Sequence, residues 1–150
     1  MKKLLVTLAF ATSAMFASAQ IQTIETNEVK TVGRLKTGGI LRCELTYVAD
    51  GTDTTYMLSF IDSRYRVLKE LRHISFNGAD NTLNTFYSIL KSFFTDNNKK
   101  NKDYTQQFKL GKDLITVKGS KSFGVYGANI YYDGSYFGMT EKDIDKVFGK

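Results

Sequence analysis

The chain has no tryptophan and no proline, and its 150 residues include one cysteine and one histidine. A single cysteine, Cys43, excludes an internal disulfide. One cysteine and one histidine, His73, cannot supply the usual ligand set of a zinc site. Without proline, the turns depend on glycine, asparagine and aspartate. We therefore expect no metal and no cofactor, and a fold that its apolar core alone stabilises.

The first nineteen residues have the three parts of a secretory signal peptide. Two lysines precede an uncharged apolar segment, Leu4–Phe16, and Ala17–Ala19 supplies a small-residue cleavage pattern. This segment is too short for a membrane-spanning helix, so no stable span should remain after cleavage. A helical N-terminus that stays attached is the less typical alternative. We predict a signal peptide at 1–19, a single globular α+β domain at 20–150, and an exported bacterial protein that is periplasmic or secreted.

The charge of the chain gives little reason to expect a nucleic-acid partner. The full chain has 21 basic and 15 acidic residues; without Lys2 and Lys3 the balance is 19 to 15, a net charge of +4. An excess of this size does not indicate nucleic-acid binding. The densest basic run, Lys99–Lys102, contains an asparagine and no aromatic residue, and we interpret it as a solvated loop.

The segment Asp80–Asp96 has clear helical periodicity. Its apolar residues recur at spacings of three and four, which places them on one helix face. Burying them would contribute about 10 kcal/mol as an upper estimate. We predict one long amphipathic helix here, with Asn77 or Asp80 as its N-terminal cap. The apolar face comprises Leu83, Phe86, Tyr87, Leu90, Phe93 and Phe94.

Strand-like alternation lies on both sides of this helix. Asp-Gly pairs at 50–51 and 133–134 predict hairpin turns, and tight turns between consecutive strands require antiparallel pairing. A capping pattern at Thr140–Asp143 predicts a short closing helix. The predicted strands are Val29–Lys36, Ile40–Val48, Thr54–Ile61 and Arg64–Phe76, then Asp103–Leu110, Asp113–Lys118, Phe123–Tyr126 and Ala128–Tyr132.

These elements predict an α+β fold in which antiparallel β-meanders pack against one long amphipathic helix, with a short C-terminal helix. In the predicted strand Arg64–Phe76 the alternation breaks near Leu68, which suggests a bulge or a bend. The two halves of the chain share a strands-then-helix order, without a convincing repeat at the level of residues.

No catalytic constellation stands out. His73 would have to serve any nucleophilic mechanism, but it lies in a predicted strand with no glycine elbow near a serine. We interpret it as an ordinary strand histidine and Cys43 as a buried, inert residue. The pairs Asp50/Asp53 and Asp143/Asp145 are explained by a turn and a helix N-terminus. We therefore predict that the protein is not an enzyme.

The segment 126–138 is the candidate binding site, because it concentrates aromatic residues among small and polar ones. Adjacent Tyr131 and Tyr132 must point to opposite faces of a strand, so one of them should meet solvent. Exposed tyrosine beside asparagine and aspartate suits contacts with sugars, peptides or protein surfaces. The alternative is that tyrosine is simply a favourable strand residue. The candidate residues are Tyr126, Asn129, Tyr131, Tyr132, Asp133 and Tyr136.

We predict a non-catalytic binding or interaction module whose partner is an envelope protein, a peptide or a glycan. Two alternatives belong to other classes. One is a carrier that holds a small apolar ligand between sheet and helix. The other is a small hydrolase that uses His73 with a carboxylate.

Overall fold

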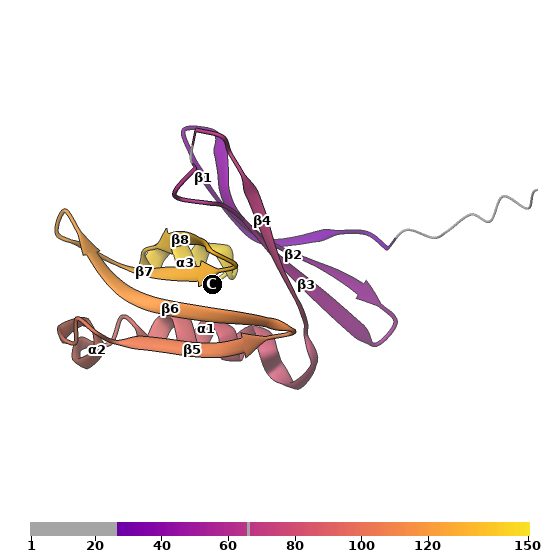
Figure 1. The fold of residues 1–150 in the computed structure, drawn as a ribbon. Helices are drawn as coiled ribbons and strands as arrows, with labels where there is room; N and C mark the ends of the chain where they lie inside the picture. The colour runs from indigo at the N-terminus through magenta and orange to yellow at the C-terminus, as the bar shows by residue number, and fades with distance from the viewer. Residues whose placement is uncertain (1–26, 66) are drawn as a thin grey trace, which may run out of the picture.

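The computed structural model describes residues 27–65 and 67–150, so the predicted signal peptide at 1–19 lies outside the described residues. The described chain forms two antiparallel four-stranded sheets with a few helices, which confirms the α+β class and the antiparallel pairing (Figure 1). Each helix in this part of the chain is too short or too polar to cross a membrane.

The strands of the first sheet lie side by side in chain order. Gly51 has φ 58° in the predicted Asp-Gly turn. The long strand predicted at Arg64–Phe76 is wrong in its first part, because the chain turns at Ser63–Arg64 and again at Val67–Lys69. The break in alternation near Leu68 therefore marks a loop. The strands are β1 (Lys30–Thr37), β2 (Ile40–Asp50), β3 (Asp53–Ile61) and β4 (Leu71–Asn77).

The second sheet repeats this up-and-down order. The strands predicted at 123–126 and 128–132 are a single strand, β7. It begins only at Val125, because the chain reverses at Phe123 and Gly124, which have φ 49° and 81°. The predicted turn at Asp133–Gly134 is confirmed between β7 and β8. The strands are β5 (Thr105–Leu110), β6 (Asp113–Ser122), β7 (Val125–Tyr132) and β8 (Ser135–Met139).

The described residues contain three α-helices. Two of them, α1 (Thr82–Ser92) and α2 (Asp96–Lys100), come between β4 and β5, and α3 (Glu141–Val147) follows β8. The helix α1 has 11 residues and is shorter than the predicted segment 80–96. A 3-10 turn, η1 (Ala79–Asn81), precedes it. Asp80 and Asn81 have φ 54° and 59°, so α1 cannot begin before Thr82.

The predicted N-terminal cap of α1 is wrong, whereas that of α3 is confirmed. Neither predicted residue caps α1: Asn77 accepts a hydrogen bond from the Ala79 amide, at 2.6 Å, ahead of the helix. In contrast, the predicted capping pattern of the closing helix is confirmed. The Thr140 hydroxyl accepts from the Asp143 amide at 3.3 Å, and the Asp143 carboxylate accepts from the Thr140 amide at 2.9 Å.

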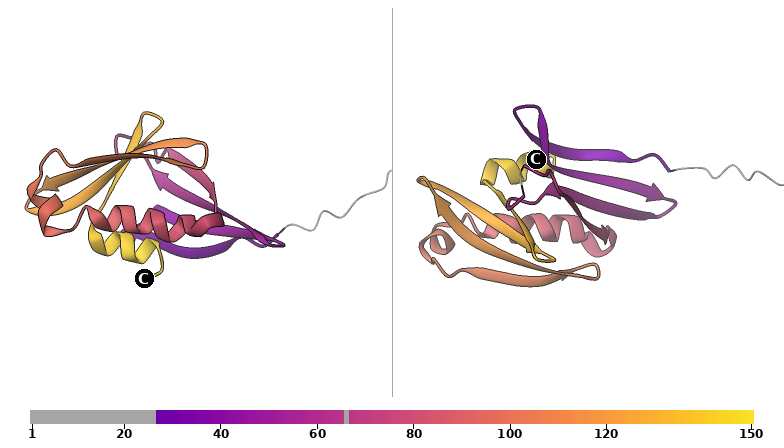
Figure 2. Two further views of the ribbon diagram at one scale, coloured as in Figure 1. Left: turned by 90° about the horizontal axis from the view of Figure 1, so that it is seen from below. Right: turned by 45° about the horizontal axis from the view of Figure 1, so that its top comes forward.

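One apolar core contains residues of both sheets and of α1 and α3. The Phe86 ring of α1 lies 5.9 Å from that of Phe76 in β4, 5.9 Å from Phe108 in β5 and 5.5 Å from Phe148 after α3, measured between ring centroids. Helices α1 and α3 lie side by side (Figure 2), where the Lys91 ammonium pairs with Asp145 at 2.9 Å. The two sheets therefore share their interior.

Strand β1 lies directly against the C-terminal end of α3, and Gly33 permits the close approach. A Cβ at this position would overlap the carbonyl oxygen of Lys146 and lie 2.6 Å from that of Val147. We expect Gly33→Ala to lower the free energy of unfolding by about 2 kcal/mol, because the strand and the helix must separate. Urea unfolding of the two proteins measures the difference.

The matched control is Gly38→Ala in the turn between β1 and β2. No atom lies within 4 Å of a Cβ built there, but φ is +57°, so the backbone strain remains without the clash. We expect a loss of about 1 kcal/mol in that variant. A loss at Gly33 no larger than at Gly38 would contradict the steric explanation.

Candidate functional site

The outer face of the second sheet carries a row of polar and aromatic side chains. Strand pairing places Gln107, Thr116, Tyr131 and Tyr136 next to one another across all four strands. The rings of Tyr131 and Tyr136 stack, with centroids 5.5 Å apart and an interplanar angle of 26°. The Gln107 amide donates to the Thr116 hydroxyl at 3.1 Å. Tyr131 is 37% exposed, so this row faces solvent.

A second row on the same face adds a positive charge and an amide. Lys118 is exposed and pairs with Asn129, which pairs with Gly138. The Lys118 ammonium lies 5.7 Å from the centroid of the Tyr131 ring, which is a favourable cation–π distance. A Cβ on Gly138 would lie 2.6 Å from Asn129 Oδ1, so glycine leaves room for the amide to cross β8. The face combines aromatic, amide and ammonium groups.

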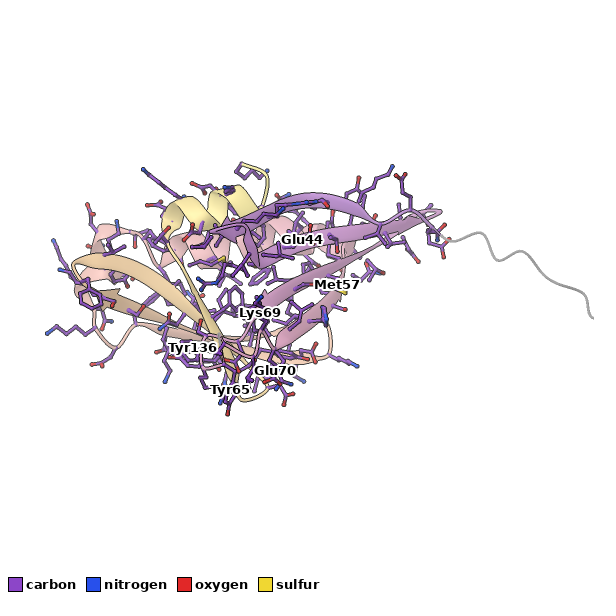
Figure 3. All side chains as sticks on the ribbon, turned by 90° about the horizontal axis from the view of Figure 1, so that it is seen from above. Glu44, Met57, Tyr65, Lys69, Glu70 and Tyr136 are labelled. Carbon is purple, nitrogen blue, oxygen red and sulfur yellow. The ribbon has the colours of Figure 1, made fainter. Side chains whose placement is uncertain are left out.

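The loop 62–70 of the first sheet extends this face. The Ser63 amide donates to the Tyr136 carbonyl at 2.8 Å, which ties the loop to edge strand β8. Tyr65 is 44% exposed, and the Arg64 guanidinium lies 5.2 Å from its ring centroid. Figure 3 shows Tyr65 and Tyr136 together at this junction. Loop and strand thus present a third tyrosine beside the stacked pair.

The buried carboxylate of Asp62 organises the junction. One of its oxygens accepts a hydrogen bond from the Arg64 amide at 3.0 Å and one from the Tyr136 amide at 3.4 Å. The other oxygen pairs with Arg64 Nη2 at 2.8 Å. Hydrogen bonds from Arg64 are the main cause of the lowered pKa of Asp62. A charged Asp62 therefore holds the loop in place.

The six residues predicted for the site divide between the two faces of the sheet. Tyr131, Asn129 and Tyr136 lie on the outer face. Tyr126 and Tyr132 belong to the opposite face and pack against the core. Burial is the main cause of the raised pKa of both phenols.

The last of the six, Asp133, is exposed in the turn between β7 and β8, with φ 44°. Its backbone conformation explains its presence there, because aspartate and asparagine tolerate the left-handed region better than most residues. The structure does not bring Asp133 into the row that contains Tyr131.

Four residues of the outer face were missed: Tyr65, Gln107, Thr116 and Lys118. The alternation within β5 and β6 places the last three on one face of their own strands. Register between strands then decides which of them meet Tyr131, and the sequence carries no direct signal of that register. Tyr65 was missed because residues 64–70 were predicted as part of a strand, whereas they belong to the loop that positions this side chain.

His73 lies in β4, where its Nδ1 is 2.9 Å from the Ser59 hydroxyl. It is exposed on the outer face of the first sheet, and pairing places Glu44 on the other side of Ser59. The partner of His73 is thus a hydroxyl, where the hydrolase alternative needs a carboxylate. Cys43 is buried, as predicted, and burial raises the pKa of its thiol. Among the described residues, no three acidic, histidine or cysteine side chains gather as metal ligands would.

A pocket between α1 and β5 is the nearest match to the predicted carrier cavity. Its volume is about 270 Å³, and Phe86, Ile89 and Phe108 contribute to its walls. Ligand sites commonly have volumes of about 300–1,000 Å³. Leu90 and Phe93, which a cavity under the helix would expose, are completely buried. The geometry favours packing over ligand storage.

Comparison of the chain with protein-family models, curated proteins and solved structures finds no match. These comparisons assign no activity, substrate or partner to the outer face. Any function of this chain is therefore inferred from its own residues and geometry.

Proposed function

We propose that the chain is an exported, non-catalytic binding module that contacts a protein, peptide or glycan through the outer face of the second sheet. The stacked pair of exposed Tyr131 and half-buried Tyr136, set among amide, hydroxyl and ammonium groups, carries this proposal. Tyrosine offers a large, rigid, amphipathic surface and loses little side-chain entropy on binding. The three-part pattern of residues 1–19 supports export.

The arrangement of the sheet favours contact through side chains over the addition of a partner strand at β8. The loop 62–70 already uses the backbone of Tyr136: Ser63 donates to its carbonyl, and its amide donates to Asp62. A partner strand could not form these bonds at the same position. The open face beside β8 keeps its tyrosines available, and the shared core beneath it supports them rigidly.

We expect the double substitution Tyr131→Ala and Tyr136→Ala to weaken partner binding by about 30-fold, because tyrosines at a protein surface often supply interface hot spots. Immobilised protein would first capture partners from envelope extracts and from a glycan array. Titration of the recovered partner against the double variant then measures the loss. The matched control is Met57→Ala on the outer face of the first sheet (Figure 3), which should bind as the unaltered protein does.

Two outcomes would overturn the proposal. In the first, the recovered partner binds the double variant and the unaltered protein equally. In the second, no partner is recovered and a hydrolase screen detects turnover that His73→Ala abolishes. Circular dichroism of each variant separates loss of binding from loss of fold.

A further inference from the structure

One end of the molecule presents an exposed apolar tip. The hairpin between β6 and β7 turns at Phe123 and Gly124, and the Phe123 side chain is fully exposed. Val125, two residues further on, is 57% exposed. Figures 1 and 2 show this tip projecting at the same end of the molecule as α2. The hairpin tip, defined as Phe123–Val125, thus offers apolar groups to whatever meets this end.

A groove rich in lysine lies beside the hairpin tip. Its volume is about 540 Å³, and Lys99, Lys100 and Lys102 line it together with Lys121 of β6. None of these four lysines forms a salt bridge with a described residue. The loop predicted at 99–102 is wrong in its first part, because Lys99 and Lys100 belong to α2, and the segment faces a fourth lysine in β6. We call these four residues the lysine groove.

The lysine groove is also lined by Tyr126, whose hydroxyl has no hydrogen-bond partner among the described residues. The Tyr126 hydroxyl is buried and forms no hydrogen bond with a described residue. It lies so close to the Gly119 backbone that a Cβ there would overlap it. An adjoining pocket continues toward α3, and its walls contain Val125, Lys99 and Lys142 together with Glu141, which pairs with Lys91.

We propose that the hairpin tip and the lysine groove form a contact surface for an anionic phospholipid bilayer. The hairpin tip enters the headgroup region, and the lysines bind lipid phosphates. Lysines near an anionic surface are attracted to it, and an apolar group gains by leaving water. Two weak signals together give stable but reversible attachment. This surface is distinct from the stacked tyrosines and does not depend on the function proposed for them.

A bilayer explains the arrangement better than nucleic acid does. Single-stranded nucleic acids use rings placed along a basic groove, where successive bases can stack. Here the ring in the wall of the groove, Tyr126, packs against the core and against Phe94. The exposed ring, Phe123, projects beyond the groove at the hairpin turn. An apolar tip beside a group of ammonium ions matches the boundary between acyl chains and charged headgroups.

The absence of tryptophan from the chain allows a direct test of tip insertion. Phe123→Trp would place a single fluorescent indole at the hairpin tip. We expect its emission to shift to shorter wavelength when vesicles with about 30% phosphatidylglycerol in phosphatidylcholine are added. The matched control is Val67→Trp, at another fully solvated apolar position, which should show no shift. An unchanged spectrum for Phe123→Trp would contradict insertion.

Vesicle co-sedimentation tests the lysine groove. We expect the triple variant Lys99→Glu, Lys102→Glu and Lys121→Glu to bind these vesicles about 100-fold more weakly, at about fivefold for each lysine. We expect Phe123→Ser to weaken binding about tenfold. The exported form without residues 1–19 is used throughout, because the apolar segment Leu4–Phe16 would itself partition into the vesicles.

The matched control replaces three exposed lysines elsewhere, Lys36, Lys109 and Lys112, by glutamate, so the net charge changes by the same amount. It should keep most of the binding. Equal losses in the control and groove variants would show that net charge alone acts, and would overturn the proposal. So would absence of vesicle binding by the unaltered protein, or binding of heparin and vesicles that depends on lysine but not on Phe123.

Discussion

Replacing Phe86 by alanine should lower the free energy of unfolding by about 4 kcal/mol. Its side chain is almost completely buried, and its ring contacts aromatic rings from β4, from β5 and from the residue after α3. The substitution therefore removes one side chain from the place where both sheets and two helices meet. Urea unfolding followed by circular dichroism measures the loss.

Two further variants keep this prediction testable if the alanine protein does not fold. Phe86→Leu retains much of the apolar volume and should lose about half as much stability. Phe123→Ala removes the same kind of side chain from a fully exposed position and should change stability by less than about 0.5 kcal/mol. Similar losses at the two phenylalanines would contradict a core role for Phe86.

Replacing Asp62 by alanine should lower the free energy of unfolding by about 3 kcal/mol near neutral pH. Its carboxylate accepts hydrogen bonds from the amides of Arg64 and Tyr136, and hydrogen bonds to charged groups contribute about 1.5–3 kcal/mol. The Arg64 guanidinium is partly exposed and can return to water, so the loss comes mainly from the amides. Thermal unfolding at pH 7 measures it.

The same contact predicts a dependence on pH. The hydrogen bonds from Arg64 lower the pKa of Asp62 in the folded protein. The stabilisation is therefore complete above the unfolded pKa, about 3.9, and is lost as pH falls through the lower folded pKa. We expect the stability difference between the unaltered protein and Asp62→Ala to be constant from pH 7 to about 5 and to shrink below about 4. A difference that grows in acid would contradict this assignment.

Local signals in the sequence predicted most of the strands and one helix end. Alternation in β2 and β3, the Asp-Gly turns and the capping box of Thr140 and Asp143 each depend on consecutive residues. The same kind of local signal did not predict the end of α1. Phe93 and Phe94 continue the spacing of the apolar face and are buried, yet α1 ends at Ser92. Apolar spacing there reports burial, while backbone conformation ends the helix.

Helix α2 shows the opposite case. Its sequence, Asp-Asn-Asn-Lys-Lys, has little intrinsic helix propensity, so a loop was the natural prediction. In the structure the Asn98 side chain donates to the Ser92 carbonyl at 2.8 Å, which folds the segment back on the end of α1. A side-chain hydrogen bond to the end of α1 thus accompanies a helical turn that intrinsic propensity does not predict.

The candidate site could be located from the sequence but not assembled from it. The density of tyrosine indicated β7 and β8, and alternation required Tyr131 and Tyr132 to diverge. The stacking of Tyr131 on Tyr136 needs the register of a hairpin, and the approach of Tyr65 needs a contact between the two sheets. Neither follows from a pattern within one segment.

The contact at Asp62 closes a much longer loop of chain than the strand turns do, so it carries a larger cost in chain entropy. Every strand pair joins consecutive strands, and most of their turns are two residues long, so closing them restricts little chain. The contact between Asp62 and Tyr136 spans a sequence separation of 74. Closing that loop costs about 3 kcal/mol more in chain entropy than closing a two-residue turn. The stacking of Phe60 on Phe137, with centroids 4.1 Å apart, helps to offset this cost beside the same junction.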